Sequence, residues 1–170
     1  MKGTKSPLFL YFILRFKMDQ KKVKDLIDEA LAENESLYLV DLVISENNKI
    51  QVTVDGDNGV PLSECIRISR SVDSNFDREE EDFSLEVSTP DISHPLKLKR
   101  QYIKNINRIL KVKTATEELE GTLVEADEDK IVLRWKAREP KPVGKGKVTV
   151  EKTVTVEYKD IKEAKVKIVF

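Results

Sequence analysis

The sequence predicts an α+β protein, with an amino-terminal two-layer α-β-β-α-β domain followed by a small all-β barrel. Up to about residue 92, amphipathic helical periodicity alternates with short β-branched runs, whereas beyond about residue 97 only short strand-like runs follow. The two parts also carry net charges of opposite sign. With 170 residues, 39% of them hydrophobic, the chain is long enough for two small cores.

Residues 1–17 differ from the rest of the chain. Their apolar run, 8–14, is far shorter than the roughly 20 residues of a membrane span, and no small-residue cleavage site follows it. Met18, followed by Asp19, is a more natural start. We expect a disordered tail that reflects an upstream start codon; the alternative is a short membrane-surface anchor. The expected domains are then 18–92 and 93–170.

The amino-terminal domain begins with a helix over 19–34, because its apolar residues recur at spacings of three and four. β-Branched residues predict strands at 37–45 and 49–55. Asn47 and Asn48 favour a hairpin turn between them, since asparagine tolerates positive φ. The apolar positions of the helix are Val23, Leu26, Ile27, Ala30 and Leu31.

A second helix follows Gly59, and Pro61 suits its first turn because a proline there loses no intrahelical hydrogen bond. An acidic run at 79–82 and a strand over 83–89 complete the domain. In that strand Phe83, Leu85 and Val87 alternate with polar residues. The apolar face of the second helix is predicted to carry Cys65, Ile68, Ser69, Val72 and Phe76.

Five short strands at 108–114, 119–126, 130–137, 153–158 and 164–170 predict a small barrel, because closure hides the edges of the sheet. The clearest is 130–137, in which one face is apolar and the other cationic. The apolar face consists of Ile131, Leu133, Trp135 and Ala137, which we assign to the barrel core.

Charge is divided between the two halves. Residues 18–96 hold 7 Lys and Arg against 19 Asp and Glu, a net of −12, and residues 97–170 hold 19 against 12, a net of +7. Such charge usually marks only a solvated surface. In the basic half, however, it coincides with one strand face and with a long, flexible loop at 138–147, an arrangement suited to a phosphate backbone. The RNA-binding candidates are Lys130, Arg134, Lys136, Arg138, Lys141, Lys145 and Lys147. The acidic half would repel RNA and favours a basic protein partner.

Chemistry at single residues is poorly supported. The chain has one cysteine, Cys65, and one histidine, His94, which leaves no disulfide framework and no Cys/His zinc site. The lone cysteine also fits a reducing compartment. A catalytic His94 would need partners from separate elements, but its polar neighbours, Asp91 and Ser93, are only adjacent in sequence. We therefore expect no catalytic residue, no metal and no cofactor.

The segment between the halves predicts a structural joint. Pro90 and Pro95 each push the preceding residue toward extended geometry and so stiffen the crossing. The joint residues are Pro90, Asp91, His94 and Pro95.

Three segments resemble the RimP family of bacterial ribosome maturation factors. Residues 86–96, EVSTPDISHPL, are similar to the family's E-V-S-S-P-G-L-D-R-P-L. Residues 59–70, GVPLSECIRISR, resemble G-V-x-L-x-x-C-x-x-x-S-R, and DIKEA at 160–164 resembles D-I-x-x-A. Asp91, Ser93 and His94 depart from the family pattern, which puts in doubt any contact made by its arginine.

The resemblance implies an Sm-like carboxy-terminal barrel and a non-enzymatic role in assembling the small ribosomal subunit, with ribosomal RNA and the basic small-subunit protein twelve as partners. We expect a cytoplasmic monomer that does not bind membranes. The main alternative is an Sm-like RNA-binding regulator unrelated to ribosome assembly. A carboxylate-dependent nuclease ranks far lower, since no spacing of acidic residues supports one.

Overall fold

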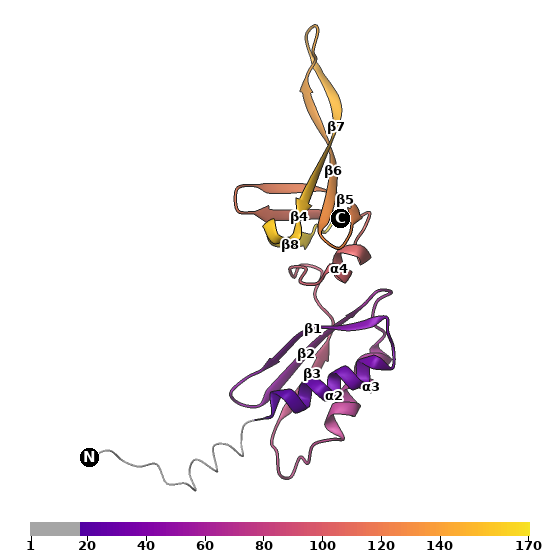
Figure 1. Cartoon of the computed structure of the whole chain (residues 1–170), viewed down its shortest axis with the longest axis vertical. Coiled ribbons are helices and arrows are strands. Elements are labelled where there is room, and N and C mark those ends of the chain that lie inside the picture. Colours follow the sequence, from indigo (N-terminus) through magenta and orange to yellow (C-terminus); the bar gives the residue numbers. More distant parts are fainter. Residues whose placement is uncertain (1–17) are drawn as a thin grey trace, which may run out of the picture. The chain divides into compact units, whose positions relative to one another are not determined.

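The computed structural model describes residues 18–170 and divides into two compact units (Figure 1). The first ends at Pro90 and the second begins at Asp91. The expectations for residues 1–17 lie outside the described residues and stay predictions. Each unit has its own core, so the two are described separately.

Two helices cover one sheet in the first unit. Helix α2 (Gln20–Ala32) begins where the Asp19 carboxylate accepts hydrogen bonds from the backbone N–H groups of Lys21 and Lys22. Helix α3 (Leu62–Asp73) forms where the sequence predicted it, although Pro61 is its N-cap residue rather than part of its first turn. It ends earlier than the predicted helix face requires: Phe76 lies beyond the last turn, although its side chain still reaches the core.

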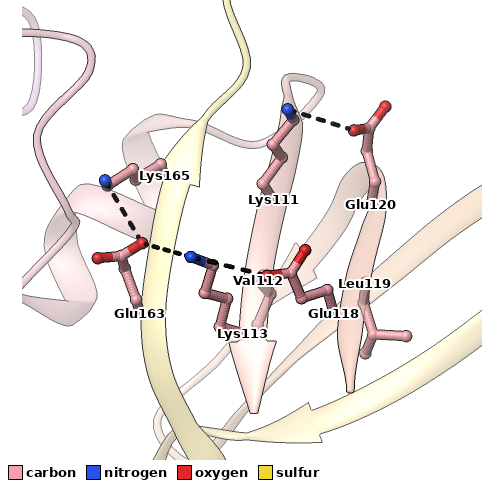
Figure 2. Close-up of a pocket in the computed structure, with 8 residues that line it drawn as sticks. All are labelled: Lys111, Val112, Lys113, Glu118, Leu119, Glu120, Glu163 and Lys165. Atoms are coloured by element: carbon pink, nitrogen blue, oxygen red, sulfur yellow. Dashed lines mark ion pairs between the residues drawn. The ribbon is translucent and has the colours of Figure 1, made fainter.

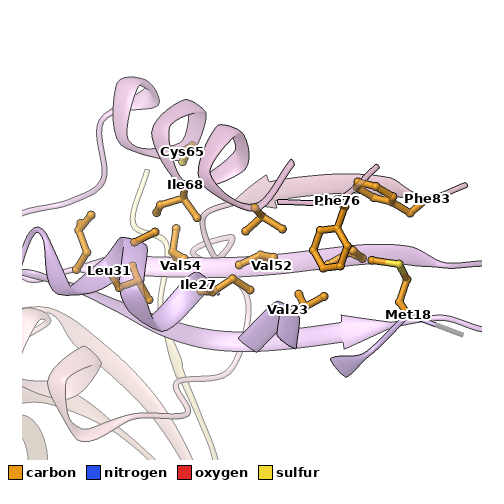
Figure 3. Close-up of a cluster of buried hydrophobic side chains, with 14 residues drawn as sticks. Met18, Val23, Ile27, Leu31, Val52, Val54, Cys65, Ile68, Phe76 and Phe83 are labelled. Atoms are coloured by element: carbon orange, nitrogen blue, oxygen red, sulfur yellow. The ribbon is translucent and has the colours of Figure 1, made fainter. Parts of the chain in front are cut away.

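The sheet of the first unit has the order β1-β2-β3. Strands β1 (Leu37–Ile44) and β2 (Lys49–Gly56) form the predicted hairpin, and Asn48 adopts a φ of 56° in its turn. Strand β3 (Ser84–Ser88) pairs parallel to β2, with α3 as the crossover. Ile50, Val52 and Val54 are fully buried in one core with residues of both helices. Figure 3 shows Val52 and Val54 in that core.

An arginine joins the two helices. The Arg67 guanidinium donates to the Ala30 carbonyl at 2.9 Å and to the Glu33 carboxylate at 2.9 Å, both near the end of α2. On its own helix it donates to Glu64 at 2.8 Å and 3.2 Å. Arg67 thus supplies a hydrogen-bond partner for a carbonyl at the end of α2 and links α2 to α3.

Five antiparallel strands in the order β7-β6-β5-β4-β8 form the second unit. Within residues 18–170, β7 pairs with β6 alone and β8 with β4 alone, so the predicted closed barrel is not confirmed. All five strands nevertheless contribute to one buried cluster. The strands are β4 (Ile109–Thr114), β5 (Glu118–Ala126), β6 (Lys130–Pro140), β7 (Lys147–Glu157) and β8 (Ile161–Val166), with a short 3-10 helix η1 (Tyr158–Asp160) before β8.

The prediction of a long, flexible loop over 138–147 is wrong. Strand β6 continues to Pro140, and β7 begins at Lys147 rather than at residue 153, so only 141–146 connect them. The last strand ends at Val166, earlier than predicted. A short helix that the sequence did not indicate, α4 (Lys99–Lys104), precedes the sheet. Its first turn is held from within, because the buried Gln101 side chain accepts from the backbone N–H of Lys97 and Leu98.

Tyr102 on α4 joins this helix to the sheet. Its ring is 4% exposed and packs edge-to-face on Tyr158, with ring centroids 5.1 Å apart. Burial raises the pKa of Tyr102 to about 12, from an ordinary value of 10.0. Because folding favours the neutral phenol, its contribution to stability is complete below the unfolded pKa and is lost as the pH rises through the folded pKa.

We therefore expect the free energy of unfolding of the second unit to fall by about 2 kcal/mol between about pH 10 and about pH 12 through this group. Urea midpoints measured across that range test it, with Tyr102→Phe as the comparison. The variant lacks the titrating phenol, so its free energy of unfolding should fall less steeply with pH. Deprotonation of the lysines affects both proteins alike. Equal slopes would show that Tyr102 does not control the alkaline limb.

Candidate nucleic-acid interface

Strands β6 and β7 extend beyond the sheet as a two-stranded ribbon (Figure 1). They pair continuously from Lys130↔Glu157 to Pro140↔Lys147. The neighbouring strand β5 pairs with β6 only as far as Arg134. Residues 135–152, which we call the arm, therefore have no third strand, and both of their faces remain open.

The two faces of the arm differ in chemistry. Residues directly opposite each other in an antiparallel pair share a face. One face carries Lys136, Arg138 and Lys147, with Thr149 and Glu151 among them. We call it the cationic face, and Arg134 continues it into the sheet. The other face is apolar, with Trp135, Ala137, Val148 and Val150, and the Lys152–Glu139 ion pair neutralises its charges.

Trp135 anchors the base of the arm. Its ring is half-buried against the core rather than fully buried as predicted. It lies over Gly121 of β5: a Cβ there would be 3.3 Å from the ring and 3.0 Å from the Arg134 carbonyl oxygen. Glycine has no Cβ and so avoids these tight contacts, which lets Trp135 lie close to the β5 backbone at the base of the arm.

The seven predicted RNA-binding residues fall into two groups. Lys130 pairs with Asp127 at 3.9 Å, and Arg134 pairs with Glu151 at 3.4 Å. The other five are exposed, and within the described part of the chain none of them forms an ion pair. They are Lys136, Arg138, Lys141, Lys145 and Lys147, and all belong to the arm.

A neighbouring surface of the same sheet shows the opposite arrangement (Figure 2). Lys113 pairs with Glu118 at 3.6 Å and with Glu163 at 3.7 Å, and Lys165 pairs with Glu163 at 3.4 Å. Glu120 accepts from Lys167 at 2.6 Å, which lowers its pKa, and lies 3.9 Å from Lys111. We call these residues the paired lattice. Its four lysines all pair with its three glutamates, which leaves a net charge of only +1, so most of the excess positive charge lies elsewhere.

The arm holds much of that excess: six Lys and Arg against two Glu, a net charge of +4. Around α4 is a second basic segment, 97–108, with five Lys and Arg and no acidic residue. This run of charge is visible in the sequence, but it lies outside the residues predicted there to bind RNA. Lys99 there already pairs with Glu128 at 3.5 Å and lies over the Tyr158 ring.

The predicted joint contains a hydrogen-bonded turn. The Asp91 carboxylate accepts from the Ser93 backbone N–H at 2.8 Å and from its hydroxyl at 2.7 Å, which lowers the pKa of Asp91. The His94 backbone N–H donates to the Asp91 carbonyl at 2.9 Å. A glycine in place of Asp91 would offer no such carboxylate. That Pro90 and Pro95 restrict the two units stays a prediction.

Residues 18–170 contain no helix long and apolar enough to cross a membrane. Nor do they bring three or more His, Cys, Asp or Glu side chains together in a group suited to a metal ion. Cys65 is buried, and burial raises the pKa of its thiol.

The structure thus defines a two-unit protein with an acidic α+β half and a basic β half that carries a cationic arm. The RimP N-terminal domain family matches residues 26–93. A protein named ribosome maturation factor RimP from Christiangramia forsetii is 54% identical over 153 residues, which are 90% of this chain and all of the relative. Its namesake from Flavobacterium psychrophilum is 53% identical over 151 residues, 89% of this chain and 98% of the relative. The chain belongs to the RimP family.

A more distant relative also matches over most of its length. The protein of that name from Porphyromonas gingivalis is 32% identical over 149 residues, 86% of this chain and 97% of the relative. The resemblance found in three short segments of sequence is therefore confirmed over most of the chain.

The close packing at the base of the arm is testable. Gly121→Val should lower the free energy of unfolding of the second unit by about 1–3 kcal/mol, because new side-chain atoms would collide with Trp135 and the Arg134 carbonyl. Trp135 is the one tryptophan of the chain, so its fluorescence during urea denaturation reports on this unit. Thr122→Val, at the next position of β5, is the control. If both variants unfold like the parent, Gly121 does not determine the packing.

Proposed function

We propose that this protein is a ribosome maturation factor that binds the free or immature small ribosomal subunit and assists its assembly without catalysis. The observation that supports an RNA contact most directly is the set of five arm cations without an ion pair. Ribosomal RNA supplies the phosphate charge that these side chains would neutralise, and the released counterions would favour binding.

The first unit supports a different contact. Its residues 18–90 hold a large excess of acidic side chains, including the run Glu79, Glu80, Glu81 and Asp82. RNA would be repelled by this unit, whereas a basic protein would be attracted at long range. By resemblance to the family, that partner is small-subunit protein twelve. One factor would then hold RNA with one unit and a ribosomal protein with the other.

The core of the second unit supports an Sm-like architecture, although within residues 18–170 no strand pairing joins the two edges of its sheet. Buried residues from all five strands belong to a single cluster, which includes Leu110, Leu123, Ile131, Val156 and Ala164. The inward-facing residues of a small barrel would form such a cluster. We propose that the factor acts as a monomer in the cytoplasm, where ribosomes are assembled.

Sedimentation of a cell extract tests the proposed function. The factor should travel with free small subunits and be absent from translating ribosomes, because an assembly factor leaves before translation begins. Its removal should increase the fraction of immature small subunits. A factor found at the top of the gradient, with normal subunit maturation in its absence, would favour the alternative of an RNA-binding regulator unrelated to assembly.

A further inference from the structure

We infer that the arm binds across the backbone of an RNA double helix, and that it does so through its cationic face without reading the bases. The inference deepens the proposed function and rests on it for the ribosomal setting of the RNA. It names the class of RNA that this surface fits: a duplex recognised by shape and charge, rather than a single strand held by base stacking.

The regular spacing of the cations is the first reason. Lys136 and Arg138, which form no ion pair among the described residues, occupy alternate positions of one strand, so their Cα atoms lie about 6.7 Å apart. Arg134, which pairs with Glu151, continues the row into the sheet. Lys147 extends the row from the other strand, opposite Pro140. Such a row suits the regular, fixed array of phosphates in a helix. A flexible single strand offers no fixed spacing to match.

The second reason is what the cationic face lacks. Its remaining arm residues are Pro140, Thr149 and Glu151, and none of them is aromatic. Proteins that hold single strands stack bases on aromatic rings. The one ring of the arm, Trp135, lies on the opposite face and packs over Gly121. Thr149 and Thr153 instead place hydroxyl groups beside the cations, where they can bond to phosphates or to ribose 2′-hydroxyls.

The third reason is access. Six residues of each strand extend past Arg134, a reach of about 20 Å. Because no third strand covers the arm, a helix can approach the whole cationic face. The paired lattice cannot serve in the same way, because its lysines already bind Glu118, Glu120 and Glu163.

Binding of the full chain to two probes tests the inference: an RNA duplex of mixed sequence and one of its strands alone. The duplex should bind at least about tenfold more tightly, with a slope of about −4 in log K against log salt, as expected for about five phosphate contacts. The arm variant, Lys136→Gln with Arg138→Gln and Lys147→Gln, should reduce that slope by about 3 and weaken duplex binding by at least about tenfold.

The matched control removes three charges from the paired lattice: Lys111→Gln, Lys113→Gln and Lys165→Gln. It removes as many positive charges as the arm variant does. Because these lysines already pair with glutamates, the control should keep most of the salt dependence of duplex binding.

Single-strand binding as tight as duplex binding, or equal losses in the two variants, would overturn the inference. A third outcome would also overturn it: the wild-type protein binds neither RNA, and the arm variant fails to sediment with subunits. The partner of the arm would then be a protein. If wild-type protein sediments with free small subunits but prefers no duplex, the inference fails and the proposed function stands. If it prefers the duplex but does not sediment with subunits, the proposed function fails.

Discussion

The arm exists because β6 and β7 satisfy each other's backbone hydrogen bonds beyond the point where the rest of the sheet ends. Eleven residue pairs join these two strands, whereas β5 follows β6 only to Arg134. A backbone N–H or C=O that left this ladder would need another partner, so the ribbon continues as a regular unit. An isolated hairpin is only marginally stable in water. The arm is continuous with the part of β6 and β7 that pairs within the sheet, and Trp135 packs over Gly121 at its base.

Register determines which charges are available. Where strands β4, β5 and β8 run together, lysines and glutamates fall opposite one another and cancel. In the arm, Lys136 and Glu151 lie opposite each other, yet Glu151 pairs with Arg134. Lys136 and Arg138 are left without an acidic partner among the described residues. A sheet of mixed composition thus holds a region of paired charges and a cationic region on neighbouring surfaces.

The sequence predicted most of the first unit, because its helices and strands follow clear hydrophobic periods. It also predicted the alternation of β6, since Ile131 and Leu133 are fully buried and Arg134 and Lys136 are exposed. It missed the length of β6 and β7, because Pro140, Gly144 and Gly146 signal a loop and the outer strand residues lack an apolar pattern. Helix α4 was missed because it is one or two turns long and its capping group, Gln101, lies inside it. Strand count alone did not tell which edges would pair, and the ion-pair partners depend on a register that the sequence does not reveal.

Photocrosslinking of the full chain bound to free small subunits, with the attached peptides identified by mass spectrometry, tests the central claim most directly. The claim is that the arm carries the RNA contact and the acidic unit does not. The account predicts that crosslinks to RNA concentrate in peptides from 135–152, and that peptides from 18–90 yield crosslinks to protein only. RNA crosslinks found chiefly in the acidic unit, with none in the arm, would contradict it.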